Sequence, residues 1–352
     1  MKTPLSHPRQ LRVVSIGGGT GLSTLLSGLK MFVGAESAPM AIGELSAIVA
    51  VTDDGGSSGR LRVERQVPPP GDIRNCMVAL GEDSLLLSRL FRHRFEGEAG
   101  LGGHNFGNLF LTALTEITGD FAEAVRLSSE VLAIKGRIYP ATTDDVHLVA
   151  ELDDGSCVFG ETSVSKAGRK IRRVRLDPPG CRPLAEAIEA IGAADIITVG
   201  PGSLFTSLVP PLLVDGVAEA VASSPAVKVL VNNLMTQPGE TDGFSSARHL
   251  EVLREYAPEI KFDWLLVNDR PISERQRLLY EFEGAEQIGV HGSVERIARI
   301  EGTRVIYDNL LDDGDKVRHH PERLARAILA CAAASRSAVD DAAGSIRQTE
   351  FQ

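Results

Sequence analysis

The sequence predicts an α/β protein in which a doubly wound, mostly parallel β-sheet lies between two layers of helices. Short runs rich in valine and isoleucine alternate along the chain with segments of helical periodicity, which is the pattern of successive strand–helix–strand units. The runs AIVAV and KVLVNN are apolar almost throughout, as expected for strands buried on both faces of a sheet. Glycine-rich turns follow several of these runs, at the edge where open parallel sheets bind ligands.

The individual elements follow from this alternation. The expected strands cover residues 11–16, 46–51, 145–151, 196–199, 228–231, 264–267 and 304–307. The expected helices cover residues 20–31, 84–95, 105–118, 121–132, 184–191, 212–223, 243–256, 273–282 and 321–334.

Residues 140–180 interrupt the alternation. The segment HLVAELDDGSCVFGE reads as two strands joined by a turn at Asp154 and Gly155, a hairpin signal. A basic, polar stretch follows at 166–175. We therefore expect a small antiparallel insertion at about 140–180 within a single domain covering 11–334, and a disordered tail at 335–352 because that tail is small and polar.

Composition excludes several functional classes. The net charge of −10 and the aromatic content of 5% argue against a nucleic-acid partner, which needs a basic or stacking surface. The N-terminus carries no secretory signal, and no run approaches the roughly 20 apolar residues of a membrane span. We expect a cytoplasmic protein without membrane insertion. Its four cysteines are far apart in the sequence, as is typical of buried thiols rather than of disulfides or a zinc site: Cys76, Cys157, Cys181 and Cys331.

The first glycine-rich turn directly follows a strand and precedes a helix. It contains Gly17, Gly18, Gly19, Thr20 and Gly21. Glycines let the backbone approach a ligand closely, and the helix start directs free N–H groups toward an anion. The turn is neither a GxGxxG fingerprint nor a Walker A loop, because a leucine replaces the last glycine and the required lysine is missing. We expect it to bind a phosphate; the alternative is a tight turn without a ligand.

The second turn, TDDGGSSGRLR, follows the next strand. Asp53 and Asp54 could hold Mg²⁺ against phosphate oxygens. Ser57 and Ser58 belong to the same loop, and Arg60 or Arg62 could offer fork-shaped hydrogen-bond donors to the phosphate. The alternative is an exposed Asp-Gly turn.

Two further motifs precede expected helices. In PPPGDIRN, Asp72 is a plausible N-cap and Arg74 could point to an anion; the alternative is a proline-stiffened helix entry. In GGHNFGN, His104 and Asn105 suit polar contact with a ligand, although a lone histidine is more often structural.

The last two motifs follow later strands. They contribute Gly200, Gly202 and Ser203 in VGPGSLFTS, and Asn232 in VNNLMTQPGET. Since the carboxyl ends of parallel strands share one edge, we expect all these loops to converge on one crevice. The convergence indicates a nucleotide site but no reaction type.

At these residues the chain resembles a known family. GGGTGLSTLLSGLK, VTDDGGSSGRLR, PPGDIRNC, GHNFGNLFL, VGPGSLFTSLVP and NNLMTQPGET occur in the order found in the gluconeogenesis factor family (YvcK type), a branch of the CofD-like superfamily that is named for 2-phospho-L-lactate transferase. The resemblance spans residues 11–334. It implies a Rossmann-like CofD fold, binding of UDP-linked sugars such as UDP-N-acetylglucosamine, and a role in cell shape and cell-wall precursor balance. By resemblance, Asp53, Asp54 and Asp72 are where the transferase branch holds its divalent metal.

Two later positions also resemble the family's UDP-sugar contacts. Tyr280 could stack on uracil and Arg318 could bind the diphosphate; the alternatives are a half-buried tyrosine and a surface arginine. The leading interpretation is a nucleotide-sugar-binding regulator, with a cell-wall-synthesis protein and a second copy of the chain as expected partners. The alternative is a metal-dependent, CofD-like transferase acting on a nucleoside-diphosphate-linked phospholactate-type donor. A dinucleotide-binding protein is disfavoured by the missing GxGxxG. The sequence assigns no catalytic residue and no certain cofactor, Mg²⁺ being the one it suggests.

Overall fold

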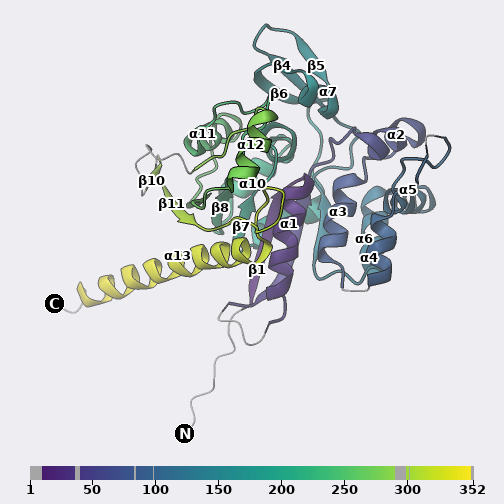
Figure 1. Cartoon of the computed structure of the whole chain (residues 1–352). Coiled ribbons are helices and arrows are strands. Elements are labelled where there is room, and N and C mark those ends of the chain that lie inside the picture. Colours follow the sequence, from purple (N-terminus) through teal and green to yellow (C-terminus); the bar gives the residue numbers. More distant parts are fainter. Residues whose placement is uncertain are drawn as a thin grey trace.

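Figure 1 shows the chain as a computed structural model. The structure describes residues 10–35, 40–82, 85–97, 99–289, 299–300 and 302–349. Three expectations fall wholly or partly outside these residues. They concern the N-terminal segment 1–9, where no secretory signal is expected, Ser84 at the start of an expected helix, and residues 350–352 of the expected tail.

Eight strands form the main sheet, in the order β10-β11-β9-β8-β7-β1-β2-β3. Every neighbouring pair is parallel except β10 with β11. Strands β7 and β9 are buried along their whole length, which explains their continuous apolar sequences. The strands are β1 (Leu11–Gly17), β2 (Ile42–Val49), β3 (Arg137–Pro140), β7 (Ile196–Val199), β8 (Val227–Val231), β9 (Trp264–Asn268), β10 (Arg299–Ile300) and β11 (Thr303–Asp308).

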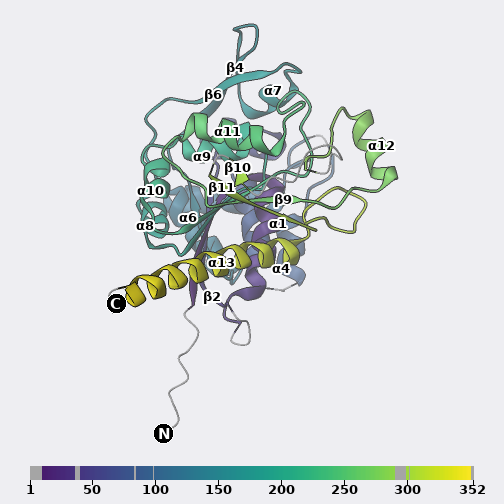
Figure 2. The same ribbon diagram turned by 90° about the vertical axis from the view of Figure 1, so that its left-hand side faces the viewer.

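Helices cover both faces of this sheet (Figures 1 and 2). Side chains alternate along β1, so that Val13 packs in one core and Val14 in the other. Helices α1, α3, α6 and α13 share the core of Val13, whereas α8, α9, α10 and α11 share that of Val14. This three-layer arrangement confirms the predicted Rossmann-like α/β fold. The α-helices are α1 (Gly19–Leu29), α2 (Gly56–Arg65), α3 (Gly71–Leu80), α4 (Leu85–Arg92), α5 (Phe106–Thr118), α6 (Phe121–Val131), α7 (Glu161–Lys166), α8 (Ala185–Ala193), α9 (Val209–Leu212), α10 (Val217–Ser223), α11 (Ser246–Tyr256), α12 (Glu274–Phe282) and α13 (Pro321–Thr349).

The expected antiparallel insertion is present at one end of the molecule (Figure 1). It is a three-stranded sheet in the order β5-β4-β6, built from β4 (His147–Leu152), β5 (Cys157–Phe159) and β6 (Ile171–Asp177). The predicted hairpin turn is confirmed, because Gly155 has a φ of 82° and donates its N–H to Leu152 O. Strand β6 was not expected, since its exposed arginines hide the alternation of its buried positions.

Other elements differ from expectation for local reasons. Helix α2 lies where a loop was predicted, because GGSSG has the composition of a loop while the burial of Leu61 and Arg62 fixes a helix. The helix expected over 212–223 is divided into α9 and α10. Helix α13 continues to Thr349, where disorder was expected; the segment is rich in alanine, the strongest helix former.

Membrane spanning was tested on the helices within the described ranges. None of these helices is, by itself, long and apolar enough to cross a membrane. One bent pair, Leu204–Leu212 with Val217–Ser223, meets the length and composition together, and both halves contribute buried side chains to the core.

Candidate functional site

The loops after β1 and β7 meet at the carboxyl edge of the sheet. A Cβ added at Gly21 would lie 2.3 Å from Pro201 O, and one added at Gly202 would lie 3.4 Å from Gly18 O. Gly202 N also donates to Asn233 Oδ1, at 3.1 Å, in the loop after β8. Three of the predicted glycine-rich loops therefore lie against one another, and only glycine at position 21 allows that contact.

A carboxylate already occupies part of the first loop. Gly19 N, in the first turn of α1, donates to Asp72 Oδ2 at 2.7 Å. The predicted N-cap role of Asp72 is wrong, because Pro70 is the N-cap of α3 and Asp72 lies in its first turn. Its side chain points away to the neighbouring loop and holds the start of α1, as an anion does at a helix N-terminus.

Asp72 belongs to a group of half-buried acids. Burial, and then the charge of Asp53, raise the pKa of Asp72 to about 6. Burial, followed by the charges of Asp53, Asp72 and Asp54, raises the pKa of Glu161 to about 9. Glu161 comes from α7 in the insertion, and no sequence motif pointed to it, because it is distant along the chain from every predicted ligand loop. The insertion thus adds an acid that stays protonated at neutral pH.

The three predicted metal aspartates are not gathered into one ligand set in the described residues. Asp53 Oδ1 accepts from Gly55 N at 2.8 Å, and Asp54 Oδ1 accepts from Thr162 N at 2.7 Å, toward the insertion. Among the residues that the structure describes, no group of three or more His, Cys, Asp or Glu side chains is arranged to hold a metal ion. Asp53 and Asp72 interact electrostatically, and a pair of carboxylates together with phosphate oxygens would suit Mg²⁺. Asp54 does not fit that role.

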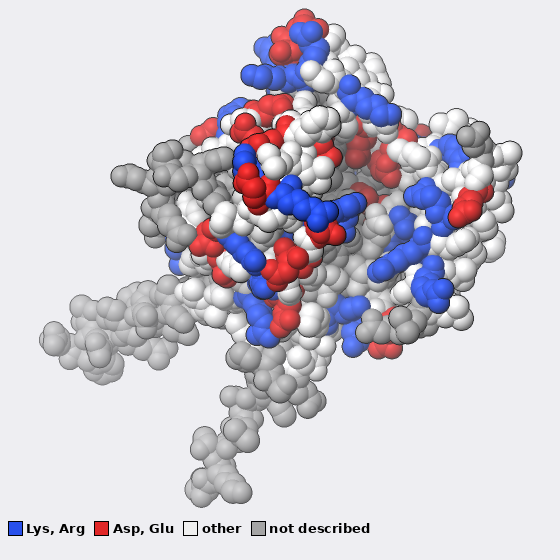
Figure 3. Space-filling view, in the orientation of Figure 1, with Lys and Arg blue, Asp and Glu red and all other residues white. Residues whose placement is uncertain are grey.

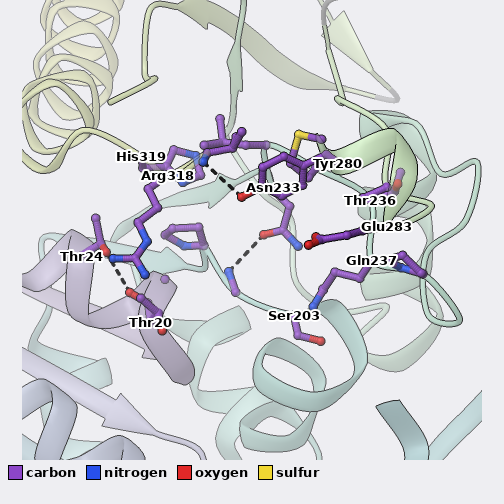
Figure 4. A pocket seen from close by; sticks show the side chains of 18 residues that line it. Thr20, Thr24, Ser203, Asn233, Thr236, Gln237, Tyr280, Glu283, Arg318 and His319 are labelled. Carbon is purple, nitrogen blue, oxygen red and sulfur yellow. Dashed lines mark hydrogen bonds between the residues drawn. The ribbon is translucent and has the colours of Figure 1, made fainter. Parts of the chain in front are cut away.

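A cavity of about 390 Å³ opens beside the first loop (Figure 4). It is lined by six of the predicted ligand residues, which come from four separate parts of the chain: Thr20, Gly21, Gly202, Ser203, Tyr280 and Arg318. Figure 4 shows the guanidinium group of Arg318 directed toward Thr20 and Thr24 at the start of α1. The Tyr280 hydroxyl accepts a hydrogen bond from Val317 N at 3.2 Å, which ties α12 to the segment that carries Arg318.

Several residues of this cavity were not predicted. Glu240 does not line the cavity itself but contacts its lining, because Ser203 donates to Glu240 Oε2 at 2.5 Å; burial raises the pKa of Glu240. His319 is buried beside Arg318, and burial lowers its pKa to about 4, so it is neutral at physiological pH. Glu240 lies within the motif VNNLMTQPGET and His319 directly follows Arg318, but nothing in these segments distinguished either side chain from its polar neighbours.

The remaining predicted residues do not line this cavity, and several hold the fold. Ser57 Oγ lies 3.1 Å from His104 Nδ1 and accepts from Asn105 N at 3.3 Å. Asn105 is the N-cap of α5, its side chain accepting from Gly107 N. Arg60 donates to Gly102 O at 2.7 Å. These contacts join α2 to the start of α5. Five others lie outside the lining of the cavity: Gly17, Gly18, Gly19, Gly200 and Ser58.

Asn232 is a separate case. It is buried and donates from Nδ2 to Asn233 O and Ser246 Oγ, at 3.0 and 3.1 Å. It therefore positions the loop after β8 behind the cavity and does not face into it.

Comparisons with known proteins agree with this fold. Residues 13–311 match the family model of 2-phospho-L-lactate transferase CofD. The chain is 46% identical over 322 residues to a gluconeogenesis factor of Halalkalibacterium halodurans, covering 91% of this chain and 96% of the relative. It is 43% identical over 315 residues to the gluconeogenesis factor of Bacillus subtilis, covering 89% and 96%. A crystal structure of a UPF0052 family protein from Bacillus halodurans superposes with a TM-score of 0.84 at 45% identity, covering 91% of this chain and 99% of that one. The resemblance that the six motifs predicted is confirmed.

Proposed function

Since the chain belongs to the CofD family, we propose that it acts as a gluconeogenesis factor that binds a nucleotide-sugar of the UDP-N-acetylglucosamine type in the cavity of Tyr280 and Arg318. One observation carries the proposal. Tyr280 and Arg318 lie on different elements, yet both line the same cavity as the glycine-rich loops after β1 and β7. An aromatic ring, a guanidinium group and a helix start together supply what a base and a diphosphate require.

The charges around the cavity support a diphosphate there. Helix α1 has no acidic residue of its own in its first turn. Asp72 already accepts from Gly19 N, so an anion in the cavity would meet the part of the helix start formed by Thr20 and Gly21. Within the described part of the chain, no carboxylate lies within ion-pair distance of Arg318. A diphosphate next to Thr20 would take that place.

We propose that the protein is a regulator rather than a catalyst. His104, the histidine of the motif GGHNFGN, is buried and its ring contacts Ser57. His319 is held neutral beside the cavity. Binding of a nucleotide-sugar here would depend on the supply of cell-wall precursor, and a partner protein would respond to the bound state.

The alternative is a metal-dependent transferase, and the coupling of Asp53 with Asp72 favours it. If Mg²⁺ bound to these two carboxylates, it would neutralise a phosphate next to Gly19. The regulator should bind its ligand equally well with Mg²⁺ and with a chelator. Chromatography of the nucleotide after long incubation tests turnover; metal-dependent conversion of UDP-N-acetylglucosamine or of a guanosine diphosphate ester would replace the regulator with the enzyme.

A thermal-shift screen tests the ligand class. The ligands are UDP-sugars, GDP, NAD and ATP, each at a concentration well above its expected Kd. A ligand at about 100 times its Kd adds roughly 2.7 kcal/mol to the unfolding free energy. We expect UDP-N-acetylglucosamine to give the largest shift. A larger shift with NAD would contradict the proposal.

A further inference from the structure

Four arginines gather on the side of the molecule formed by α2 to α5. They are Arg60 on α2, Arg74 on α3, Arg92 at the end of α4 and Arg94 just after it; we call them the arginine wall. Arg60 and Arg94 donate to the neighbouring carbonyls of Gly102 and Gly103, both at 2.7 Å. Figure 3 shows basic side chains along this side of a central hollow.

The arginine wall lacks acidic partners. Across the described residues, no Asp or Glu carboxylate lies within 4.0 Å of any of its four guanidinium groups. Arg62, on the same helix as Arg60, is different, because it forms an ion pair with Asp145. The wall therefore holds positive charge that the fold does not use in ion pairs.

Arg74 is the clearest sign of an unfilled site. Its Nε is buried and has no hydrogen-bond partner, and a buried donor left unpaired is costly. Its side chain lies against Gly107, since a Cβ added there would be 2.8 Å from Arg74 Cδ. Gly107 is in the first turn of α5, the positive end of that helix.

This wall is separate from the nucleotide cavity. None of its four arginines lines the cavity of Tyr280 and Arg318. Asp72 links the two regions, because it holds Gly19 N of the first loop and also acts electrostatically on Arg74. An anion bound by the arginine wall would therefore lie near Asp72, next to Arg74 on the same helix, α3.

We propose that the arginine wall binds the phosphate group of a second small molecule, at a site distinct from the nucleotide cavity. Arg74, Arg92 and Arg94 would contact the phosphate oxygens, and planar guanidinium groups suit that geometry. Such a site gives a regulator a second input, and gives a transferase a place for a phosphorylated co-substrate. The proposal holds whether or not the nucleotide assignment is correct.

Calorimetric titration with inorganic phosphate and with pyrophosphate tests the site. The variant is the double substitution Arg92→Gln and Arg94→Gln, both exposed positions that tolerate glutamine. The matched control is Arg89→Gln, one turn earlier on α4. Because each lost charge-assisted contact costs about tenfold in affinity, we expect the double variant to bind phosphate at least tenfold more weakly, with Arg89→Gln close to wild type.

Three results would overturn the proposal. Phosphate binding that is lost in Arg318→Ala and retained in the double variant would place the anion in the nucleotide cavity. An equal loss in Arg89→Gln would indicate nonspecific attraction to surface charge. No saturable binding of either probe to the wild type would show that the wall is not an anion site. Titration of UDP-N-acetylglucosamine into the same variants tests the nucleotide cavity separately.

Discussion

Single residues set the distance between the two loops of the cavity. Gly21 is the clearest case, because a Cβ there would meet Pro201 O at 2.3 Å. Gly21→Ala should therefore push the loops apart, lower the unfolding free energy by about 1–3 kcal/mol through overpacking, and weaken nucleotide binding. Denaturant unfolding and calorimetry measure the two effects.

The control for this change is Gly192→Ala in α8, where an added Cβ meets nothing within 4 Å. That variant should be unchanged or more stable by roughly 0.5–1 kcal/mol, as alanine replaces glycine within a helix. Gly21→Ala with wild-type stability and affinity would show that the two loops do not need close contact.

Glu161 predicts a pH dependence of stability. Its pKa is raised from the usual 4.5 to about 9 in the folded protein, so the folded state binds a proton that the unfolded state releases. Its contribution to stability is greatest below pH 4.5 and is lost as the pH rises toward 9. Glu161→Gln cannot lose a proton, so the variant should gain stability over wild type as the pH rises across this window.

Urea unfolding at pH 5, 7 and 9 checks this difference. The exposed Glu186 supplies the control Glu186→Gln, which should follow the wild-type slope. A Glu161→Gln slope that matches the wild type would mean that Glu161 is ionised in the folded protein, contrary to the account of the acid group.

The sequence predicted the residues that line the cavity better than it predicted Glu161 in the neighbouring group of acids. Thr20, Gly21, Gly202 and Ser203 were predictable because each belongs to a glycine-rich turn after a strand, and such turns have a local signature. Glu161 was not, since it joins the site only through the fold of the insertion. The N-cap role of Asn105 could not be predicted, because an N-cap and a ligand contact require the same residue type and only the hydrogen bond from Gly107 N reveals the cap; the ligand contact stays a prediction.

At the scale of elements, helix α12 carries Tyr280, which lines the cavity, while most of its other side chains are exposed. Gln276 is its one residue classed as buried in the structure, and it donates to Gly314 O at 2.9 Å. A capping box of Ser273 and Gln276 fixes the start of the helix. Tyr280 thus depends on a helix that is held by few contacts.

Ser273→Ala should loosen this helix. Loss of an N-cap costs about 1 kcal/mol, which is roughly a fivefold change in an equilibrium constant. We expect faster amide exchange in α12 and affinity for UDP-N-acetylglucosamine lowered about fivefold, with exchange slowed again by saturating ligand. Hydrogen-exchange mass spectrometry without and with ligand measures both the exchange rate in α12 and its slowing by the ligand.

Asp120→Ala is the comparison for the capping change, because Asp120 caps α6 through Glu123 N, at 2.8 Å. It should destabilise α6 without altering affinity. If Ser273→Ala leaves affinity unchanged while α12 exchanges faster, Tyr280 does not contribute to binding.

Elements differed in how well the sequence predicted them. Strands such as β7 and β9 were clear, because burial on both faces demands continuous apolar runs. Helix α2 was missed and α3 was expected only as a helix entry at Asp72, since their glycines, serines and prolines indicate loops, whereas packing of Leu61 and Met77 fixes helices. The short β3 and β10 carry too few residues to show a period, and only pairing with β2 and β11 defines them.

For the whole molecule, the fold brings to one sheet edge groups that are distant in the sequence. The first loop, the loop after β7, helix α12 and the segment before α13 all contribute to one cavity. The insertion contributes Glu161 and α3 contributes Asp72 next to this cavity. The arginine wall lies close to Asp72, because Arg74 is on the same helix. The second copy and the cell-wall-synthesis partner stay predictions.

The central claim is that this cavity binds a nucleotide-sugar through Arg318. Calorimetric titration of UDP-N-acetylglucosamine into wild type, Arg318→Ala and the control Arg326→Ala tests it most directly. Arg326 is exposed and pairs with Glu322 on α13, so its loss should change affinity less than about twofold. Because a charge-assisted contact is worth roughly 1.5–3 kcal/mol, Arg318→Ala should bind about 10- to 150-fold more weakly. Equal affinity of wild type and a folded Arg318→Ala variant would contradict the account.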